Sequence, residues 1–178
     1  MFRCLAALVL SVLPMAADAQ WTGVSRSEMR RVGGWETWTE EDRLYNTRTA
    51  YIATATFEEQ LKLIIGCSGG AYTAQFTLGS LTFEREAVLN WRVEAGTIAQ
   101  LKLVNAQDHN VLRVDTGSEG GGVAIRSFLE VLSRSDMLVF EITDGRSRAR
   151  GLHDLHQLPS AILQAPECDR LAKDLGLR

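Results

Sequence analysis

The stretch that decides the fold is residues 49–78, which read TAYIATATFEEQLKLIIGCSGGAYTAQFTL. Its first nine residues are rich in β-branched and aromatic side chains, residues 58–60 are polar, and residues 61–67 form a second apolar run. After the turn at residues 68–70, a third run follows over residues 71–78. Runs of this length, separated by polar or glycine-rich turns, are typical of β-strands. We therefore expect a hairpin followed by a third strand.

The same pattern extends on both sides of this stretch. Apolar and polar residues alternate with period two over 35–39, 87–93 and 98–104, and a short apolar run covers 111–114. Residues 40–42 are acidic and predict a turn or a solvated face. Strands that recur about every ten residues between polar turns are typical of sandwiches and barrels. The expected fold is mainly β, either a β-sandwich or a curled antiparallel sheet.

The periodicity changes toward the C-terminus. Residues 123–132 repeat apolar side chains at helical spacing, whereas residues 137–142 are strongly β-prone and pair back on 146–150 through an Asp-Gly turn. Helical spacing returns over 152–163, and residues 167–175 favour a last helical turn or two. One or two helices are therefore expected to pack near the C-terminal end of the sheet.

The N-terminus has the three-part layout of a secretory signal peptide. Arg3 precedes the apolar run 5–14, and the small-residue triplet Ala17-Asp18-Ala19 offers a cleavage point. The apolar run is too short for a bilayer, which takes roughly twenty residues to cross. This favours cleavage over a retained anchor. We expect a signal peptide at 1–19 and a single mostly-β domain at 20–178, periplasmic or secreted and without a membrane span.

Cleavage changes the cysteine count, because Cys4 leaves with the signal and only Cys67 and Cys168 remain. In an oxidising compartment such a pair indicates a disulfide. The alternatives are two free thiols or a shared metal, and two cysteines without clustered histidines make a poor metal site.

The sequence carries no enzyme signature and no cofactor motif. The formal net charge of −3 and the scattered charges argue against a nucleic-acid surface. No Gly-x-Ser-x-Gly elbow occurs. The carboxylate pairs Glu40-Glu41 and Glu58-Glu59 are sequence neighbours, which on a strand point to opposite faces. The leading hypothesis is a non-enzymatic accessory or binding protein that contacts an envelope protein.

Two features are candidates for a binding surface. Trp35 and Trp38 lie three residues apart, so on one strand they face opposite ways and at least one is expected to be exposed. The glycine loop 117–122, which contains Gly120 and Gly121, precedes a helix and so offers backbone N–H groups to an anion. It lacks the Lys and the Ser or Thr of a phosphate loop, which favours a flexible connection.

The alternative hypothesis is a small-ligand or metal-binding protein, or an enzyme, that uses His153 and His156. Their spacing of three places both imidazoles on one face if the segment is helical. A third ligand is missing from the local sequence, so no metal site is predicted.

Spaced residues over roughly 48–170 resemble a family of small exported proteins. The strand run Leu61-Lys-Leu-Ile-Ile-Gly-Cys67, a Phe-x-x-x-Leu helix at Phe128–Leu132 and the C-terminal segment 148–168 carry the resemblance. The chain is similar to the VasI-type periplasmic proteins associated with type VI secretion, and less closely to the invasion-associated locus B family. It departs from the first in having Gly66 where Arg is usual, and from the second in lacking additional cysteines. The resemblance implies an exported, disulfide-closed accessory protein and carries over no catalytic residue.

Export and the disulfide can be tested together. The exported protein is expected to begin at Gln20 and to contain no alkylatable thiol until it is reduced. Intact-mass analysis with and without reduction measures both properties. A mass that starts at Met1, or two thiols that react without reductant, contradicts the prediction.

Overall fold

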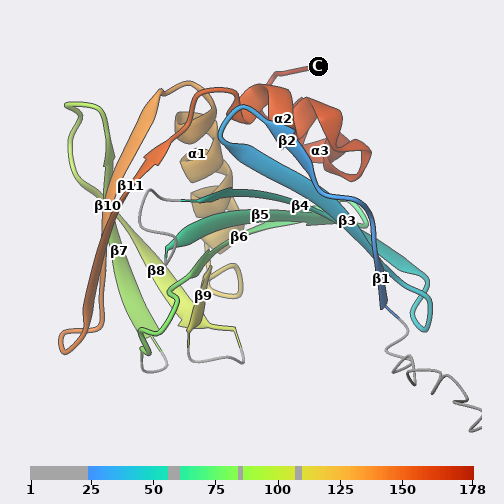
Figure 1. Cartoon of the computed structure of the whole chain (residues 1–178). Coiled ribbons are helices and arrows are strands. Elements are labelled where there is room, and N and C mark those ends of the chain that lie inside the picture. The colour runs from blue at the N-terminus through green and yellow to red at the C-terminus, as the bar shows by residue number, and fades with distance from the viewer. Residues whose placement is uncertain (1–23, 56–60, 84–85, 107–109) are drawn as a thin grey trace, which may run out of the picture.

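A single antiparallel β-sheet makes up most of the computed structural model of the chain (Figure 1). The structure describes residues 24–55, 61–83, 86–106 and 110–178. The predicted signal peptide and the predicted hairpin tip at 58–60 lie outside these ranges. The strands are β1 Val24–Arg26, β2 Arg30–Val32, β3 Trp35–Asp42, β4 Thr47–Ala55, β5 Lys62–Ser68, β6 Ala71–Thr77, β7 Glu86–Val93, β8 Ala99–Asn105, β9 Val111–Val114, β10 Met137–Thr143 and β11 Arg148–Asp154. The helices are α1 Gly121–Ser133, α2 Leu158–Gln164, the 3₁₀ turn η1 Pro166–Cys168 and α3 Asp169–Asp174.

The sheet curls back on itself. Its strand order is β1-β3-β4-β5-β6-β9-β8-β7-β10-β11, with β2 paired to β3 beside β1. At the far end of this order, β11 also contacts β4. The predicted fold class is confirmed: the chain is a mainly β, curled antiparallel sheet, and α2 and α3 lie near the C-terminus (Figure 1).

Period-two burial explains why the strands form one core. In β7 the side chains of Ala87, Leu89 and Trp91 are buried while their neighbours face outward. The helix α1 lies between two arms of the curled sheet, the first formed by β1–β6 and the second by β7, β8, β10 and β11 (Figure 1). The buried face packs on α1, where the Trp91 and Phe128 rings lie edge to face with centroids 4.9 Å apart. Each fully buried aromatic or aliphatic side chain contributes about 1.5–3 kcal/mol. This shared core holds the two arms together.

A disulfide fastens the C-terminal helices to the sheet. Cys67 of β5 and Cys168 of η1 are bonded, with their Cα atoms 5.2 Å apart, as predicted. Polar contacts surround the bridge: Arg48 Nε lies 2.7 Å from Glu167 Oε1, and the Tyr72 hydroxyl donates to Asp174 Oδ2 at 3.1 Å. The helical segment after residue 157 is therefore attached covalently and electrostatically to the end of β4, β5 and β6.

Two sequence predictions were wrong at element boundaries. The segment 152–163 was expected to be helical, but β11 continues to Asp154 because it pairs along its whole length with β10, and α2 begins only at Leu158. Leucines at 152, 155 and 158 have a spacing of three that also fits a strand followed by a turn. Residues 40–42 continue β3 instead of turning, because both β1 and β4 pair with them.

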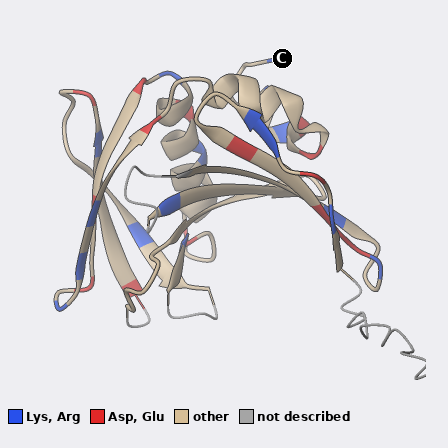
Figure 2. Cartoon of the chain, viewed as in Figure 1, with Lys and Arg blue, Asp and Glu red and all other residues tan. Residues whose placement is uncertain are grey.

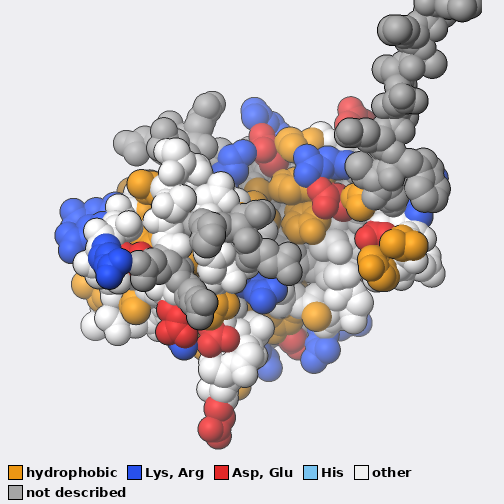
Figure 3. Space-filling view, turned by 90° about the horizontal axis from the view of Figure 1, so that it is seen from below, with side chains coloured by type: hydrophobic (Ala, Val, Ile, Leu, Met, Phe, Trp, Pro, Cys, Tyr) orange, Lys and Arg blue, Asp and Glu red, His pale blue; other side chains and the backbone are white. Residues whose placement is uncertain are grey.

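Charged side chains of both signs are interspersed over the molecule (Figure 2). Seen from below, basic and acidic groups alternate with apolar side chains (Figure 3). Among the residues that the structure describes, no helix is long and apolar enough to cross a membrane.

The disulfide closes 101 positions, so it restricts the unfolded chain strongly. The double variant Cys67→Ala/Cys168→Ala is expected to lose about 4 kcal/mol of unfolding free energy. Urea unfolding followed by tryptophan fluorescence measures this loss. Reductant should destabilise the wild type and leave the double variant unchanged, and equal midpoints for the two oxidised proteins would contradict the prediction.

Candidate functional site

A groove of about 720 Å³ crosses the solvent-facing side of β8, β7, β10 and β11. Leu138, Phe140 and Ile142 of β10 are buried in the core, so the intervening Val139 and Glu141 face the groove. The residues that line it are Leu61, Asn90, Trp91, Arg92, Ile98, Gln100, Val139, Phe140, Glu141, Arg150, Gly151 and Leu152. The side chains of Trp91 and Phe140 belong to the opposite, buried face, so these two residues contribute backbone to the floor.

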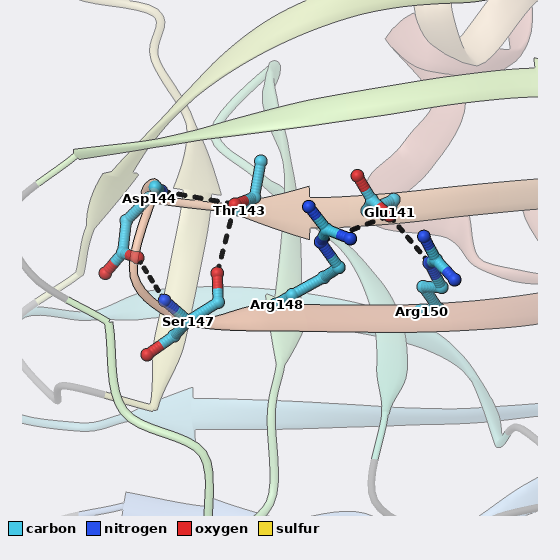
Figure 4. Close-up of polar contacts among 7 residues, drawn as sticks. Glu141, Thr143, Asp144, Ser147, Arg148 and Arg150 are labelled. Carbon is cyan, nitrogen blue, oxygen red and sulfur yellow. Dashed lines mark hydrogen bonds and ion pairs between the residues drawn. The ribbon is translucent and has the colours of Figure 1, made fainter.

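One wall of the groove is a polar row that runs across the strands. Asn90, Glu141 and Arg150 lie opposite one another in the register, and Gln100 continues the row on β8. Arg150 Nε donates to Glu141 Oε2 at 2.6 Å, and the Gln100 amide donates to Asn90 Oδ1 at 2.8 Å. Arg148 Nε lies 3.5 Å from the same Glu141 oxygen (Figure 4).

The hairpin between β10 and β11 is held by its own side chains. Asp144 Oδ1 accepts from the backbone N–H of Ser147 at 2.7 Å, and the Thr143 hydroxyl donates to the Ser147 carbonyl at 3.1 Å (Figure 4). These contacts fix the turn that sets the β10–β11 register. The polar wall therefore stands on a rigid hairpin.

The other wall is an apolar row with a single charge. Val139 lies opposite both Arg92 and Leu152, and Ile98 extends the row beyond the start of β8. Leu152 is 41% exposed and Ile98 is 68% exposed. The Arg92 guanidinium is exposed and forms no hydrogen bond or ion pair with any residue that the structure describes. A ligand would meet aliphatic carbon and an uncompensated positive charge here.

The two tryptophans predicted to form a surface lie on opposite faces of β3. Trp35 is fully buried, and its indole N–H donates to the His156 carbonyl at 3.1 Å, so it belongs to the core. Trp38 is half-buried and stacks on Tyr51 with ring centroids 5.3 Å apart. The Arg26 guanidinium lies 5.2 Å from the Trp38 ring centre. These contacts use the Trp38 ring to attach β1 to the sheet, and it does not stand free for a ligand.

The predicted glycine loop connects β9 to α1. Gly120 is exposed and left-handed, with φ 82°, whereas Gly121 is buried and a Cβ there would lie 2.4 Å from the Asp115 carbonyl oxygen. The Asp115 carboxylate already accepts the Gly117 N–H at 3.0 Å, and this hydrogen bond lowers the pKa of Asp115. The loop N–H of Gly117 is therefore already used by a carboxylate of the same chain and is not available to an external anion. This supports the interpretation of residues 117–122 as a connection between β9 and α1.

The two histidines do not share a helix face, because His153 lies in β11 and His156 in the turn that follows. His156 is exposed, with Nδ1 3.5 Å from Asp136. His153 is fully buried, and its ring stacks on Phe140 at 5.0 Å. Within the described ranges, no group of three His, Cys, Asp or Glu side chains is arranged to hold a metal.

The buried His153 ring has no polar contact within the described part of the chain. Neither ring nitrogen finds a hydrogen-bond partner among the residues that the structure describes, and burial lowers the pKa of His153 to about 4. The Phe140 ring reaches His153 by lying across Gly151, where a Cβ would come within 2.4 Å of Phe140 Cζ. The ring pair therefore requires glycine at 151.

The groove residues were not predicted from the sequence. The run 137–142 is apolar at almost every position, so it predicts a strand but does not single out one face. The signal for an exposed apolar surface was Val139, an aliphatic residue on the face opposite Leu138, Phe140 and Ile142. Leu152 is also an aliphatic residue on the outward face of its strand, but the apolar spacing over 152–163 assigned it to a helix. Arg92 and Arg150 look like ordinary surface charges until the register places them in one groove.

Neutral His153 makes the stability depend on pH in a defined direction. Because the folded-state pKa lies near 4 and the unfolded value near 6.5, the unfolded chain binds the extra proton between these values. The contribution of neutral His153 to the free energy of unfolding is therefore fully present above pH 6.5. It falls by about 3 kcal/mol as the pH drops to 4.

The measurement compares urea unfolding from pH 7 to 4 for the wild type and for His153→Phe, which keeps an aromatic ring on Phe140. The variant should lose this part of the pH dependence. The exposed-histidine control His156→Gln should behave as the wild type does. Parallel pH profiles for the wild type and His153→Phe would contradict the assignment.

No protein-family model matches the chain, and no curated protein and no solved structure matches it significantly. The resemblance to VasI-type proteins therefore stays a prediction.

Proposed function

We propose that this chain is a non-enzymatic, exported accessory protein that binds a segment of a partner protein in the groove across β8, β7, β10 and β11. The observation that carries the proposal is the groove itself, in which outward-facing Val139 and Leu152 lie beside Arg92, which has no partner in the described part of the chain. Exposed aliphatic side chains bordered by polar residues are typical of interaction sites, and arginine is enriched in them.

The rigidity of the groove also supports a binding role. Its walls stand on paired strands, and the Arg150–Glu141 and Gln100–Asn90 contacts hold the polar wall across neighbouring strands. A preformed surface loses little side-chain entropy when a ligand binds, which favours affinity. The predicted export signal and the disulfide are consistent with a protein that works in the envelope.

The histidine-based alternative has weaker support. Its premise was that His153 and His156 lie on one helix face, and the buried His153 ring instead packs on Phe140 in the core. No observation on the described residues favours a metal-dependent role over binding.

Site-specific photo-crosslinking in the native compartment tests the proposal. A photoreactive residue at Leu152 or Ile98 should yield a discrete adduct with a partner protein, because both side chains line the groove. The matched control is Val123 of α1, which is 70% exposed and lies outside the groove lining. Val139→Asp should reduce the adduct about tenfold by placing a charge against apolar ligand surface.

Each variant is first checked for a wild-type melting temperature, so that loss of the adduct reports on the groove and not on folding. Equal adducts at Val123 and Leu152, or no adduct at either groove position, would contradict the proposed function.

A further inference from the structure

From the charge and length of the groove we infer its ligand: an extended partner segment of about four residues that carries a carboxylate beside an aliphatic side chain. This inference rests on the proposed function and specifies the chemistry of the segment bound. It follows from three features of the groove: its excess charge, its apolar row and its span across the strands.

The excess charge is positive and local. Arg148 and Arg150 both approach one oxygen of Glu141, at 3.5 and 2.6 Å, so two guanidinium groups share one carboxylate. Arg92 adds a third guanidinium without a partner among the described residues. Within the groove lining, Arg92 and Arg150 outnumber the one carboxylate, Glu141, although the whole chain has a formal charge of −3. A planar guanidinium matches a carboxylate with two parallel hydrogen bonds.

The apolar row lies directly beside that charge. Val139 is the cross-strand neighbour of both Arg92 and Leu152, so one aliphatic surface two strands wide adjoins the Arg92 guanidinium. A ligand that presents an aliphatic and an acidic group on the same side would contact the aliphatic surface and pair with the Arg92 guanidinium at once. In an extended chain, residues i and i+2 point to the same side about 7 Å apart.

The span of the groove sets the length of the segment. From β8 to β11 the row crosses three inter-strand spacings, about 14 Å in total. An extended segment rises about 3.3 Å per residue, so about four residues cross it. Such a segment places an aliphatic side chain on Val139 and Leu152 and an acidic side chain at Arg92.

The test uses acetyl-Leu-Ser-Glu-Ser-Leu-amide as the probe and the same peptide with Gln in place of Glu as its neutral match. Both are titrated into ¹⁵N-labelled full-length mature protein while amide chemical shifts are recorded. The acidic peptide should shift amides of 90–92, 139–141 and 150–152 and bind about tenfold more tightly than the neutral one.

Recognition of the ligand carboxylate by Arg92 is tested with matched variants. Arg92→Gln should remove the difference between the two peptides. Arg113→Gln, which removes an exposed arginine of β9 outside the groove lining, should keep the difference. Equal affinity of both peptides for the wild type, or shifts confined to other surfaces, overturns the inference.

Other ligands of the groove would give distinct results, and each of these results also overturns the inference of an acidic, extended segment. Laurate that shifts the same amides with higher affinity than the acidic peptide identifies an acyl chain as the ligand. A dimer mass in light scattering that Leu152→Asp reduces to a monomer identifies a second copy. Failure of charge discrimination while crosslinks at Leu152 persist overturns only the ligand assignment, whereas absence of those crosslinks overturns the proposed function.

Discussion

The central position of β10, paired on one side with β7 and on the other with β11, is the constraint on which the rest of the structure depends. Phe140 lies opposite Trp91 in one ladder and opposite Gly151 in the other. This double pairing sends alternate residues of β10 to opposite faces. One face closes over α1 through Trp91 and Phe128, and the other becomes the floor and walls of the groove. Slipping either ladder by one residue would exchange the two faces and expose the core.

The same constraint explains why the buried face contains a histidine. His153 lies opposite Leu138, so the register that places Leu152 and Arg150 in the groove also turns the imidazole inward. There it stacks on Phe140, without a hydrogen-bond partner in the described structure. Removing a polar ring nitrogen from water without a partner costs about 1–3 kcal/mol. The groove and the buried imidazole are thus two consequences of one strand register.

Local periodicity was sufficient to predict most strands, because period-two burial is written directly in segments such as 35–39 and 87–93. It failed at 152–163, where pairing with β10 overrides a leucine spacing that also fits a helix. The disulfide was predictable because only two cysteines follow the predicted signal peptide. The groove was not, because Arg92, Val139 and Leu152 come from three strands, and their juxtaposition depends on register between segments up to 60 positions apart. Period-two reasoning says which face a residue occupies and nothing about its cross-strand neighbour.

The disulfide and the groove occupy different parts of this sheet. The disulfide, the Arg48–Glu167 pair and the Tyr72–Asp174 hydrogen bond gather where β4, β5 and β6 meet the C-terminal helices. The groove lies mainly on β7, β8, β10 and β11, with Leu61 at its end. The solvent face of the second arm carries the exposed side chains of Leu152 and Ile98, together with Arg92, which has no partner among the described residues. Because Arg92 lies on the face opposite the core, Arg92→Gln alters the proposed binding surface, and the packing of Trp91 on Phe128 of α1 is expected to stay unchanged.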